Sequence, residues 1–188
     1  MFERLLEQLA QALDSRSIAY MVIGGQAVLL YGEPRLTRDI DITLGVSTDR
    51  LPALLEVVGV LGMRSRVPDP ESFVRETMVL PCEEVTSAIR VDFIFSNTPY
   101  EAQALSRGKP VRIGASEVRY ASLEDLIIHK LVAGRPRDIE DVRSILVRNA
   151  DYDREYVQRW LADFEAVTGD PLRLVLADLE SEIRSTRC

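Results

Sequence analysis

Two aspartates, Asp39 and Asp41, stand two positions apart in a segment whose other residues are mostly apolar. In a strand, such residues project from the same face, roughly 6 to 7 Å apart. Two carboxylates this close repel each other unless a cation lies between them, and oxygen ligands suit Mg²⁺. The pair indicates a magnesium site, although a solvated acidic strand face would give the same pattern.

The glycine pair Gly24-Gly25 follows the short apolar run 18–23 and precedes a short helical segment. Without side chains, the backbone N–H groups at a helix N-terminus can approach a phosphate closely. Next to the aspartates, this arrangement indicates a cradle for the phosphates of a nucleoside triphosphate beside its magnesium. A tight turn that needs glycine only for its dihedral angles is the alternative.

A third acidic residue, Asp92, interrupts the apolar segment 89–95. A buried carboxylate without a partner is costly. If this strand lies beside residues 38–44, Asp92 completes a three-carboxylate cluster able to hold the second of two metal ions about 3.5 to 4 Å apart. Pairing with Arg90 or another arginine is the alternative.

The elements that must position these side chains follow from hydrophobic periodicity. Residues 38–44 alternate, so that Ile40 and Ile42 face a core while the aspartates face away from it. Besides 18–23 and 38–44, the expected strands are 73–80, 88–95 and two small edge strands, 111–113 and 118–120, with a turn-rich segment at 81–84. The expected helices are 2–15, 26–31, 51–61, 100–106, 122–133, 138–147, 154–164 and 171–183.

This order predicts an α/β fold of the α+β type, with an α/β core over residues 1–121 and a helical C-terminal subdomain over 122–188. The net charge of −7 argues against a broad surface for non-specific nucleic-acid binding. Without an apolar run of membrane-spanning length or a signal peptide, we expect a cytoplasmic protein with no membrane partner. Cys82 and Cys188 have no spacing typical of a disulfide framework or zinc site.

The segments 22–27, Val-Ile-Gly-Gly-Gln-Ala, and 34–42, Pro-Arg-Leu-Thr-Arg-Asp-Ile-Asp-Ile, resemble the signature of the DNA polymerase β-like nucleotidyltransferase superfamily. Segments 123–131 and 135–142 resemble the abortive-infection toxin type of small bacterial nucleotidyltransferase. The resemblance implies a small mixed sheet flanked by helices, a glycine pair that holds the triphosphate, aspartates that hold magnesium, and a later lysine and aspartate that complete the pocket. On this sequence these residues are Gly24, Gly25, Asp39, Asp41, Lys130 and Asp138.

Helical spacing supports an inward-pointing Lys130, because Leu126, Ile127 and Leu131 surround it on the apolar face. Its amine then needs a polar destination such as a triphosphate, unless it escapes to water along its stem. Asp138 either shares this site or caps the helix that begins after Pro136. His129, the only histidine, falls on the polar side and is expected at the surface.

Arg35 and Thr37 lie just before the acidic strand and are expected to contact phosphate or the ligands of the metal. Pairing of Arg35 with Glu33 or with the aspartates is the alternative.

Together the patterns predict a nucleotidyltransferase that uses two Mg²⁺ ions to move a nucleoside monophosphate from a triphosphate to a hydroxyl of tRNA, a protein or a small molecule. Asp39 and Asp41 would hold the ions, Asp92 would position the ion that activates the acceptor, and Lys130 would neutralise phosphate charge. The toxin resemblance implies an antitoxin protein as partner. A nucleotide-binding module of the same fold, without transfer, is the competing prediction.

Overall fold

The computed structural model describes residues 2–37, 39–96 and 98–186 of the chain. The chain divides into two compact units. The first unit comprises Met1–Gln26 and Leu36–Ala121, and the second comprises Ala27–Arg35 and Ser122–Cys188.

The segment Ala27–Arg35 belongs to the second unit, whereas the sequence placed it in the α/β core. Hydrogen bonds explain why this segment belongs to the second unit. The Asn149 side chain donates to the carbonyl oxygen of Tyr31 at 2.8 Å, and the backbone N–H of Glu33 donates to the Ser144 hydroxyl at 3.3 Å.

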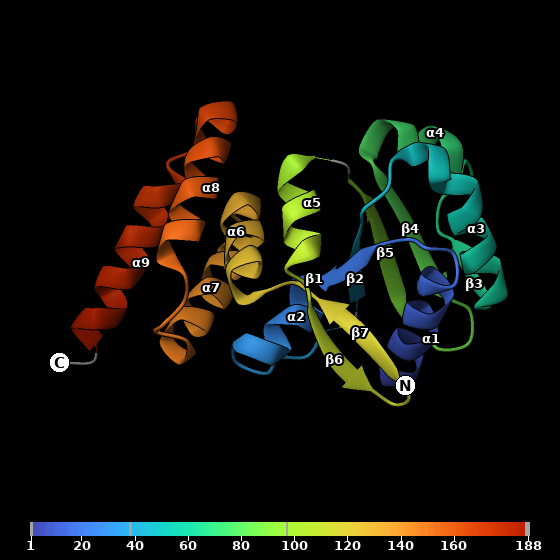
Figure 1. Ribbon diagram of the computed structural model, residues 1–188, viewed down its shortest axis with the longest axis horizontal. Helices are drawn as coiled ribbons and strands as arrows, with labels where there is room; N and C mark the ends of the chain where they lie inside the picture. Colours follow the sequence, from blue (N-terminus) through green and yellow to red (C-terminus); the bar gives the residue numbers. More distant parts are fainter. Residues whose placement is uncertain (1, 38, 97, 187–188) are drawn as a thin grey trace. The chain divides into compact units, whose positions relative to one another are not determined.

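The first unit contains a seven-stranded mixed sheet with strand order β3-β4-β5-β2-β1-β7-β6 (Figure 1). β2 is parallel to β5 and β1 to β7, while the other neighbours are antiparallel. The strands are β1 Tyr20–Ile23, β2 Asp39–Leu44, β3 Met63–Ser65, β4 Val79–Glu84, β5 Arg90–Phe95, β6 Lys109–Ile113 and β7 Ser116–Tyr120. The predicted fold class, a mixed sheet with flanking helices, is confirmed. β7 lies between β1 and β6, so it is not the edge strand that we expected.

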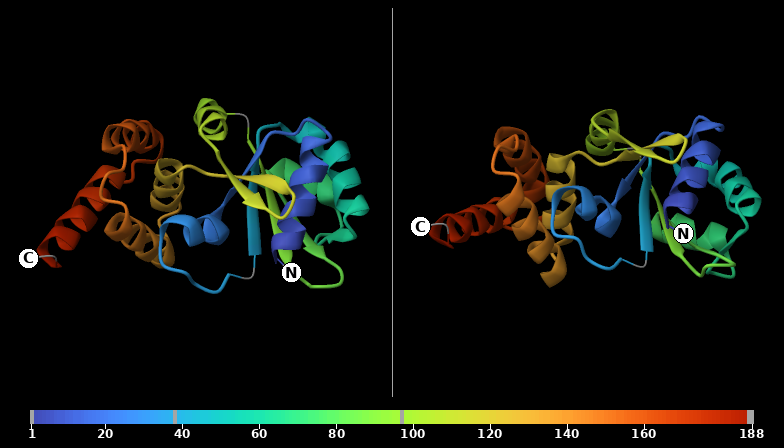
Figure 2. Two further views of the ribbon diagram at one scale, coloured as in Figure 1. Left: turned by 60° about the horizontal axis from the view of Figure 1, so that its bottom comes forward. Right: turned by 90° about the horizontal axis from the view of Figure 1, so that it is seen from below.

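Helices of the first unit pack on this sheet. They are α1 Phe2–Asp14, α3 Leu51–Val60, α4 Pro70–Thr77 and α5 Pro99–Ser106, with a short 3-10 helix Thr48–Arg50 before α3. α1 contacts β6, β7 and α3, and the views in Figure 2 show α1 and α3 side by side. The side chains of Ile40, Ile42 and Leu44 are buried, as the alternation in β2 predicted. These apolar residues hold the acidic strand in the core.

Residues 70–77 form helix α4, so the prediction of a strand over 73–80 is wrong. The Asp69 side chain accepts a hydrogen bond from the backbone N–H of Ser72, and Pro70 occupies the first turn, a strong helix start. Met78, with φ of 61°, ends the helix. The segment expected as turn-rich, 81–84, is part of β4, and β3 was not predicted.

The second unit is helical. It holds part of α2 Gly24–Tyr31 and the helices α6 Leu123–Ala133, α7 Pro136–Arg148, α8 Arg154–Thr168 and α9 Leu172–Thr186. α6 packs against α7, α8 and α9, burying Leu126, Ile127 and Leu131. No helix in the described ranges has the length and apolar character that crossing a membrane requires.

Candidate active site

Three carboxylates of the first unit lie on one face of two neighbouring strands. Asp39 and Asp41 alternate with buried residues of β2, so both side chains project from the same side. β5 pairs in parallel with β2, and the register sets Asp92 directly beside Asp41. In register, these two residues share a face, about 4.8 Å apart. The structure therefore meets the condition that the sequence set for Asp92.

This cluster is incompletely satisfied within the protein. Oδ1 of Asp39 and Oδ1 of Asp92 are both buried, and neither has a hydrogen-bond partner in the described part of the chain. Burial raises the pKa of Asp92, and the negative charge of Asp39 raises it further, while Arg66 and Arg90 act in the opposite direction. Desolvated carboxylates that repel each other favour a bound cation.

The donor set fits magnesium through its chemistry, since all three groups are carboxylates. No group of three acidic, histidine or cysteine side chains among the described residues is gathered tightly enough to form a metal cage. The two findings agree with each other, because Mg²⁺ is usually held by one or two carboxylates together with substrate phosphates and water. Among the described residues, the carboxylates alone therefore do not form a complete metal site.

Two independent constraints require a glycine at position 24. Its φ is 61°, in the left-handed region that side chains disfavour. A Cβ atom at this position would lie 2.0 Å from Oδ2 of Asp41 and 2.8 Å from its Cγ. Because Gly24 has no Cβ, the Asp41 carboxylate can occupy this space beside the start of α2. Gly25 follows in the first turn of the helix.

A side-chain hydrogen bond joins the first turn of α2 to the start of the acidic strand. Nε2 of the buried Gln26 donates to the Thr37 hydroxyl at 2.6 Å. Thr37 was predicted as a site residue, and its position next to Gln26 was not. Gln26 was missed because a polar residue after two glycines gives no signal of its direction.

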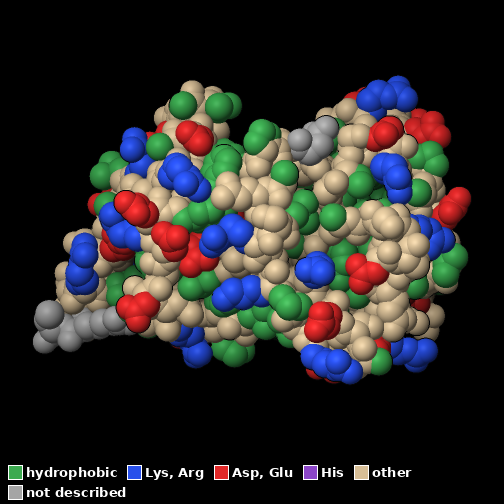
Figure 3. Space-filling model, in the orientation of Figure 1, with side chains coloured by type: hydrophobic (Ala, Val, Ile, Leu, Met, Phe, Trp, Pro, Cys, Tyr) green, Lys and Arg blue, Asp and Glu red, His purple; other side chains and the backbone are tan. Residues whose placement is uncertain are grey.

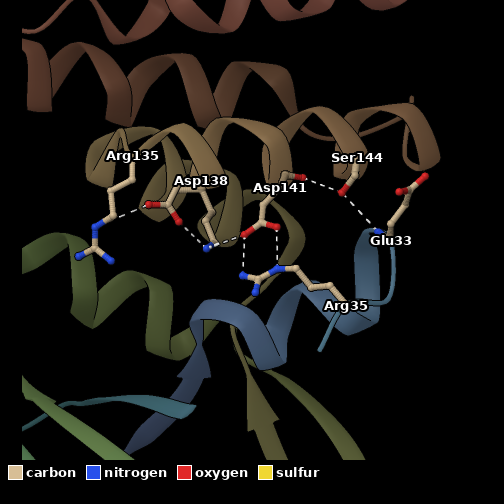
Figure 4. Close-up of polar contacts among 7 residues, drawn as sticks. Glu33, Arg35, Arg135, Asp138, Asp141 and Ser144 are labelled. Atoms are coloured by element: carbon tan, nitrogen blue, oxygen red, sulfur yellow. Dashed lines mark hydrogen bonds and ion pairs between the residues drawn. The ribbon is translucent and has the colours of Figure 1, made fainter. Parts of the chain in front are cut away.

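Lys130 and Asp138, the two later residues that the resemblance implied, are bonded to each other in the second unit. The Lys130 Nζ lies 2.6 Å from Oδ1 of Asp138 and 2.9 Å from Oδ2 of Asp141, and all three residues are buried. The Arg35 guanidinium binds Asp141 in a bidentate manner, with Nε and Nη2 each 2.9 Å from a carboxylate oxygen (Figure 4). These hydrogen bonds lower the pKa of Asp141 against the opposing effect of burial.

These contacts decide between the alternatives that the sequence left open for Lys130, Asp138 and Arg35. The Lys130 amine ends on carboxylates, so it does not escape to water. Asp138 does not cap α7, because Arg135 holds the N-cap position and makes no side-chain cap bond. Arg35 pairs with Asp141, not with Glu33 or the aspartates of β2.

Asp141 was missed by the sequence analysis, although a signal existed. Asp138 and Asp141 are three residues apart in a helix, which puts them on one face. An inward-pointing lysine needs such a pair, and both aspartates follow it within a short distance along the chain.

His129 does not lie at the surface as predicted. It is half-buried, and burial lowers its pKa to about 4, an effect that Lys130 reinforces. The imidazole is therefore neutral in the folded protein at physiological pH.

The family model for "Nucleotidyltransferase of unknown function (DUF6036)" matches residues 1–170 of the chain. No curated protein gives a significant match.

Solved structures with a similar fold include several nucleotidyltransferases. An antigenic nucleotidyltransferase-like protein from Paracoccidioides brasiliensis is 19% identical over 97% of this chain and 91% of that chain, with a TM-score of 0.58. ANT(2'')-Ia, in complex with adenylyl-2''-tobramycin, is 18% identical over 96% of this chain and 97% of its own, with a TM-score of 0.53. MenT4, a nucleotidyltransferase toxin from Mycobacterium tuberculosis H37Rv, is 13% identical over 84% of this chain and 61% of its own, with a TM-score of 0.51. At these identities the likeness shows a shared fold.

Gly24→Ala is expected to lower the free energy of unfolding by about 1–3 kcal/mol, because the new Cβ is strained and meets the Asp41 carboxylate. Urea unfolding followed by circular dichroism measures the change. Gly59→Ala is the matched control, since a Cβ there meets nothing within 4 Å, and it should alter stability by less than about 1 kcal/mol. In the Asp41→Ala background the cost of Gly24→Ala should shrink; an unchanged cost would show that the clash does not matter.

Lys130→Met is expected to cost about 3 kcal/mol of unfolding free energy or more, because it leaves the buried Asp138 without its close cation and removes one of the two cations bound to Asp141. Arg143→Met, which breaks the exposed ion pair with Glu182, should cost about 0.5 kcal/mol or less. Equal losses from both variants, measured by urea unfolding, would contradict a structural role for the buried pair.

Titration of His129 should make the free energy of unfolding depend on pH between about 5.5 and 7.5. In the unfolded chain its pKa returns to about 6.5, so that chain binds a proton as the pH falls while the folded protein does not. Because the unfolded state takes up more protons, stability decreases by about 1.3 kcal/mol between pH 7.5 and 5.5 through this group alone. Urea unfolding over this range should show a shallower loss in His129→Gln; parallel curves for the two proteins would refute the assignment.

Proposed function

The chain belongs to the DUF6036 family of nucleotidyltransferases, and we propose that it uses magnesium to move a nucleoside monophosphate from a nucleoside triphosphate to a hydroxyl acceptor. The observation that carries the proposal is the carboxylate face shared by β2 and β5. Asp92 lies in register with Asp41, and Oδ1 atoms of Asp39 and Asp92 are buried without a partner in the described chain.

In this proposal Asp39, Asp41 and Asp92 hold two Mg²⁺ ions together with the substrate phosphates. When bound, the metal neutralises phosphate charge and lowers the pKa of the acceptor hydroxyl. The backbone N–H groups of Gly24 and Gly25, at the start of α2, donate to phosphate oxygens.

The transfer forms a bond between the acceptor oxygen and the α-phosphorus and breaks the bond from that phosphorus to pyrophosphate. We assign the acceptor's proton to the Asp92 carboxylate. Burial and the charge of Asp39 raise the pKa of Asp92, which favours proton acceptance by this carboxylate.

Lys130 and Asp138 enter the proposal through the resemblance stated for their segment. In the second unit the Lys130 amine donates a hydrogen bond to Asp138. We propose that Lys130 neutralises phosphate charge of the nucleotide. Arg35, held by Asp141, and Thr37 are proposed to assist in phosphate binding.

The acceptor classes in the proposal are RNA, protein and small molecules. ANT(2'')-Ia, with its adenylyl-2''-tobramycin complex, illustrates a small molecule on the same fold, and the toxin MenT4 supports a role in a toxin and antitoxin pair. An antitoxin protein is the corresponding proposed partner.

The test is transfer of label from α-phosphate-labelled ATP, GTP, CTP and UTP, with Mg²⁺, into RNA, cell protein and a panel of small hydroxyl compounds. Label should appear with the wild-type protein and be lost with EDTA, and Asp39→Asn/Asp41→Asn should reduce the rate by at least about 100-fold. Glu117→Gln, which removes one exposed carboxylate from β7, is the control and should retain full activity. Magnesium-dependent nucleotide binding with no label on any acceptor would instead support the binding-module alternative.

A further inference from the structure

A group of charged side chains in the second unit is buried, unlike the charges on the molecular surface. On the face drawn in Figure 3, acidic and basic side chains are interspersed, as on an ordinary solvated surface. Ion pairs on such a surface, like that of Arg143 with Glu182, contribute little to stability. The side chains of Lys130, Asp138 and Asp141, in contrast, are only 9%, 10% and 5% exposed. Buried charges are costly unless they have close partners, so the geometry of this group is closely constrained.

Asp141 is the residue that both cations of the group share (Figure 4). Its Oδ1 accepts a hydrogen bond from Nε of Arg35 at 2.9 Å, and its Oδ2 accepts one from Nη2 of Arg35, also at 2.9 Å. The same Oδ2 lies 2.9 Å from the Lys130 amine. One carboxylate therefore sets the distance between the ammonium group and the guanidinium group.

The segment that carries Arg35 is also held against the helix that carries Asp141. Asp141 and Ser144 lie three residues apart in α7, on one face of the helix. The Ser144 hydroxyl accepts a hydrogen bond from the backbone N–H of Glu33 at 3.3 Å. A Cβ atom at Gly32 would lie 2.6 Å from this hydroxyl oxygen, so the backbone passes close to α7. Arg35 is thus anchored both by its guanidinium and by the backbone just before it.

The group balances in charge, so it offers an anion directed N–H donors and no net positive charge. An ammonium group has three N–H donors, and two carboxylates face that of Lys130. A guanidinium group has five, of which that of Arg35 directs two at Asp141. Within the described ranges, both cations therefore keep further donors for a ligand. Arg35 is the more accessible of the two, with 24% of its side chain exposed.

We propose that Asp141 is a positioning residue, whose carboxylate holds the Lys130 amine and the Arg35 guanidinium at a fixed spacing for the phosphates of the nucleoside triphosphate. This inference rests on the proposed function, in which both cations bind phosphate. A guanidinium group and a phosphate match through paired N–H···O bonds. Holding the Arg35 fork in one orientation before the nucleotide arrives reduces the entropy lost on binding. Asp141 acts through the two cations and not through contact with the nucleotide.

Asp141→Asn separates positioning from charge, because the two effects have opposite signs. The substitution removes a negative charge, which by electrostatics alone would tighten the binding of a triphosphate. An amide, however, offers one acceptor oxygen and one NH₂ group, whereas both oxygens of Asp141 accept from N–H donors. In either orientation of the amide a donor faces a donor, so the spacing of the two cations is lost.

Calorimetric titration of the full chain with ATP, GTP, CTP and UTP, with Mg²⁺ and without acceptor, measures triphosphate binding separately from transfer. For the triphosphate that binds tightest, Asp141→Asn should weaken binding about tenfold, the loss expected for a hydrogen bond to a charged group. Arg35→Lys keeps the charge but cannot form the paired bonds, and should weaken binding in the same direction. The double variant should lose less than the product of the two single effects.

Asp125→Asn is the matched control. Asp125 is another buried aspartate of the second unit, and it accepts hydrogen bonds from the hydroxyls of Ser122 and Tyr156. This variant should leave triphosphate affinity unchanged. Circular dichroism and urea unfolding show which variants are folded under the assay conditions. If Asp141→Asn does not fold, Arg35→Lys decides the test, and unchanged triphosphate affinity in that variant overturns the proposal.

Steady-state transfer assays distinguish positioning from a purely structural role. A destabilised variant contains fewer active molecules, so its apparent kcat falls while both KM values stay unchanged. Asp141→Asn should instead raise the KM for the triphosphate about tenfold and leave the KM for the acceptor unchanged.

The proposal is overturned if folded Asp141→Asn binds the triphosphate as tightly as the wild type or more tightly, or if only its kcat falls. Label transfer by the wild type alongside either result would leave the proposed function intact. Weaker triphosphate binding in Asp141→Asn, with no label transferred by the wild type to any acceptor, would support the role of Asp141 and refute the proposed transfer alone. A wild type that binds none of the four triphosphates would overturn both.

Discussion

The parallel pairing of β2 with β5 is the constraint on which the candidate site depends. It places Asp92 beside Asp41 and leaves Oδ1 atoms of Asp39 and Asp92 buried without partners in the described chain. Burying like charges together is unfavourable, so the sheet must be held by other forces. The apolar residues between the aspartates of both strands, among them Ile40 and Val91, stabilise the sheet by packing into the core.

A second pairing, that of β1 with β2, explains the glycine at position 24. Because β1 pairs with β2 so that Ile23 lies in register with Asp41, the residue after Ile23 approaches the Asp41 carboxylate directly. Only a residue without Cβ, and with access to positive φ, fits there. One pairing register therefore fixes a glycine, a carboxylate pair and the start of α2 together, which is why these features occur as one motif in the sequence.

The sequence predicted the parts of the fold that local patterns determine. Strict alternation identified β2, and helical periodicity identified α1, α3 and the C-terminal helices. It failed at α4, where the apolar residues around Phe73 suggested a strand but the Asp69 cap and Pro70 start a helix. For the site, the resemblance singled out Lys130 and Asp138, yet the partners of Lys130 depend on how α6 packs against α7. Contacts between elements distant in sequence, such as Arg35 with Asp141, leave no local pattern to read.

The two polar clusters differ in electrostatic balance, and that difference bears on their roles. In the second unit, Lys130 and Arg35 face Asp138 and Asp141, so two cations match two anions and each charge has a partner at 2.6 to 2.9 Å. Such a buried network is costly to break, although Oδ2 of Asp138 is also buried without a hydrogen-bond partner among the described residues. On the sheet face of the first unit, three aspartates lie together and two buried oxygens lack a partner among the described residues. A fold that buries carboxylate oxygens of Asp39 and Asp92 without a hydrogen-bond partner in the described ranges gives up stability there. That cost is recovered when a cation binds to the folded state, so the unbalanced cluster is the one expected to gain most from a ligand.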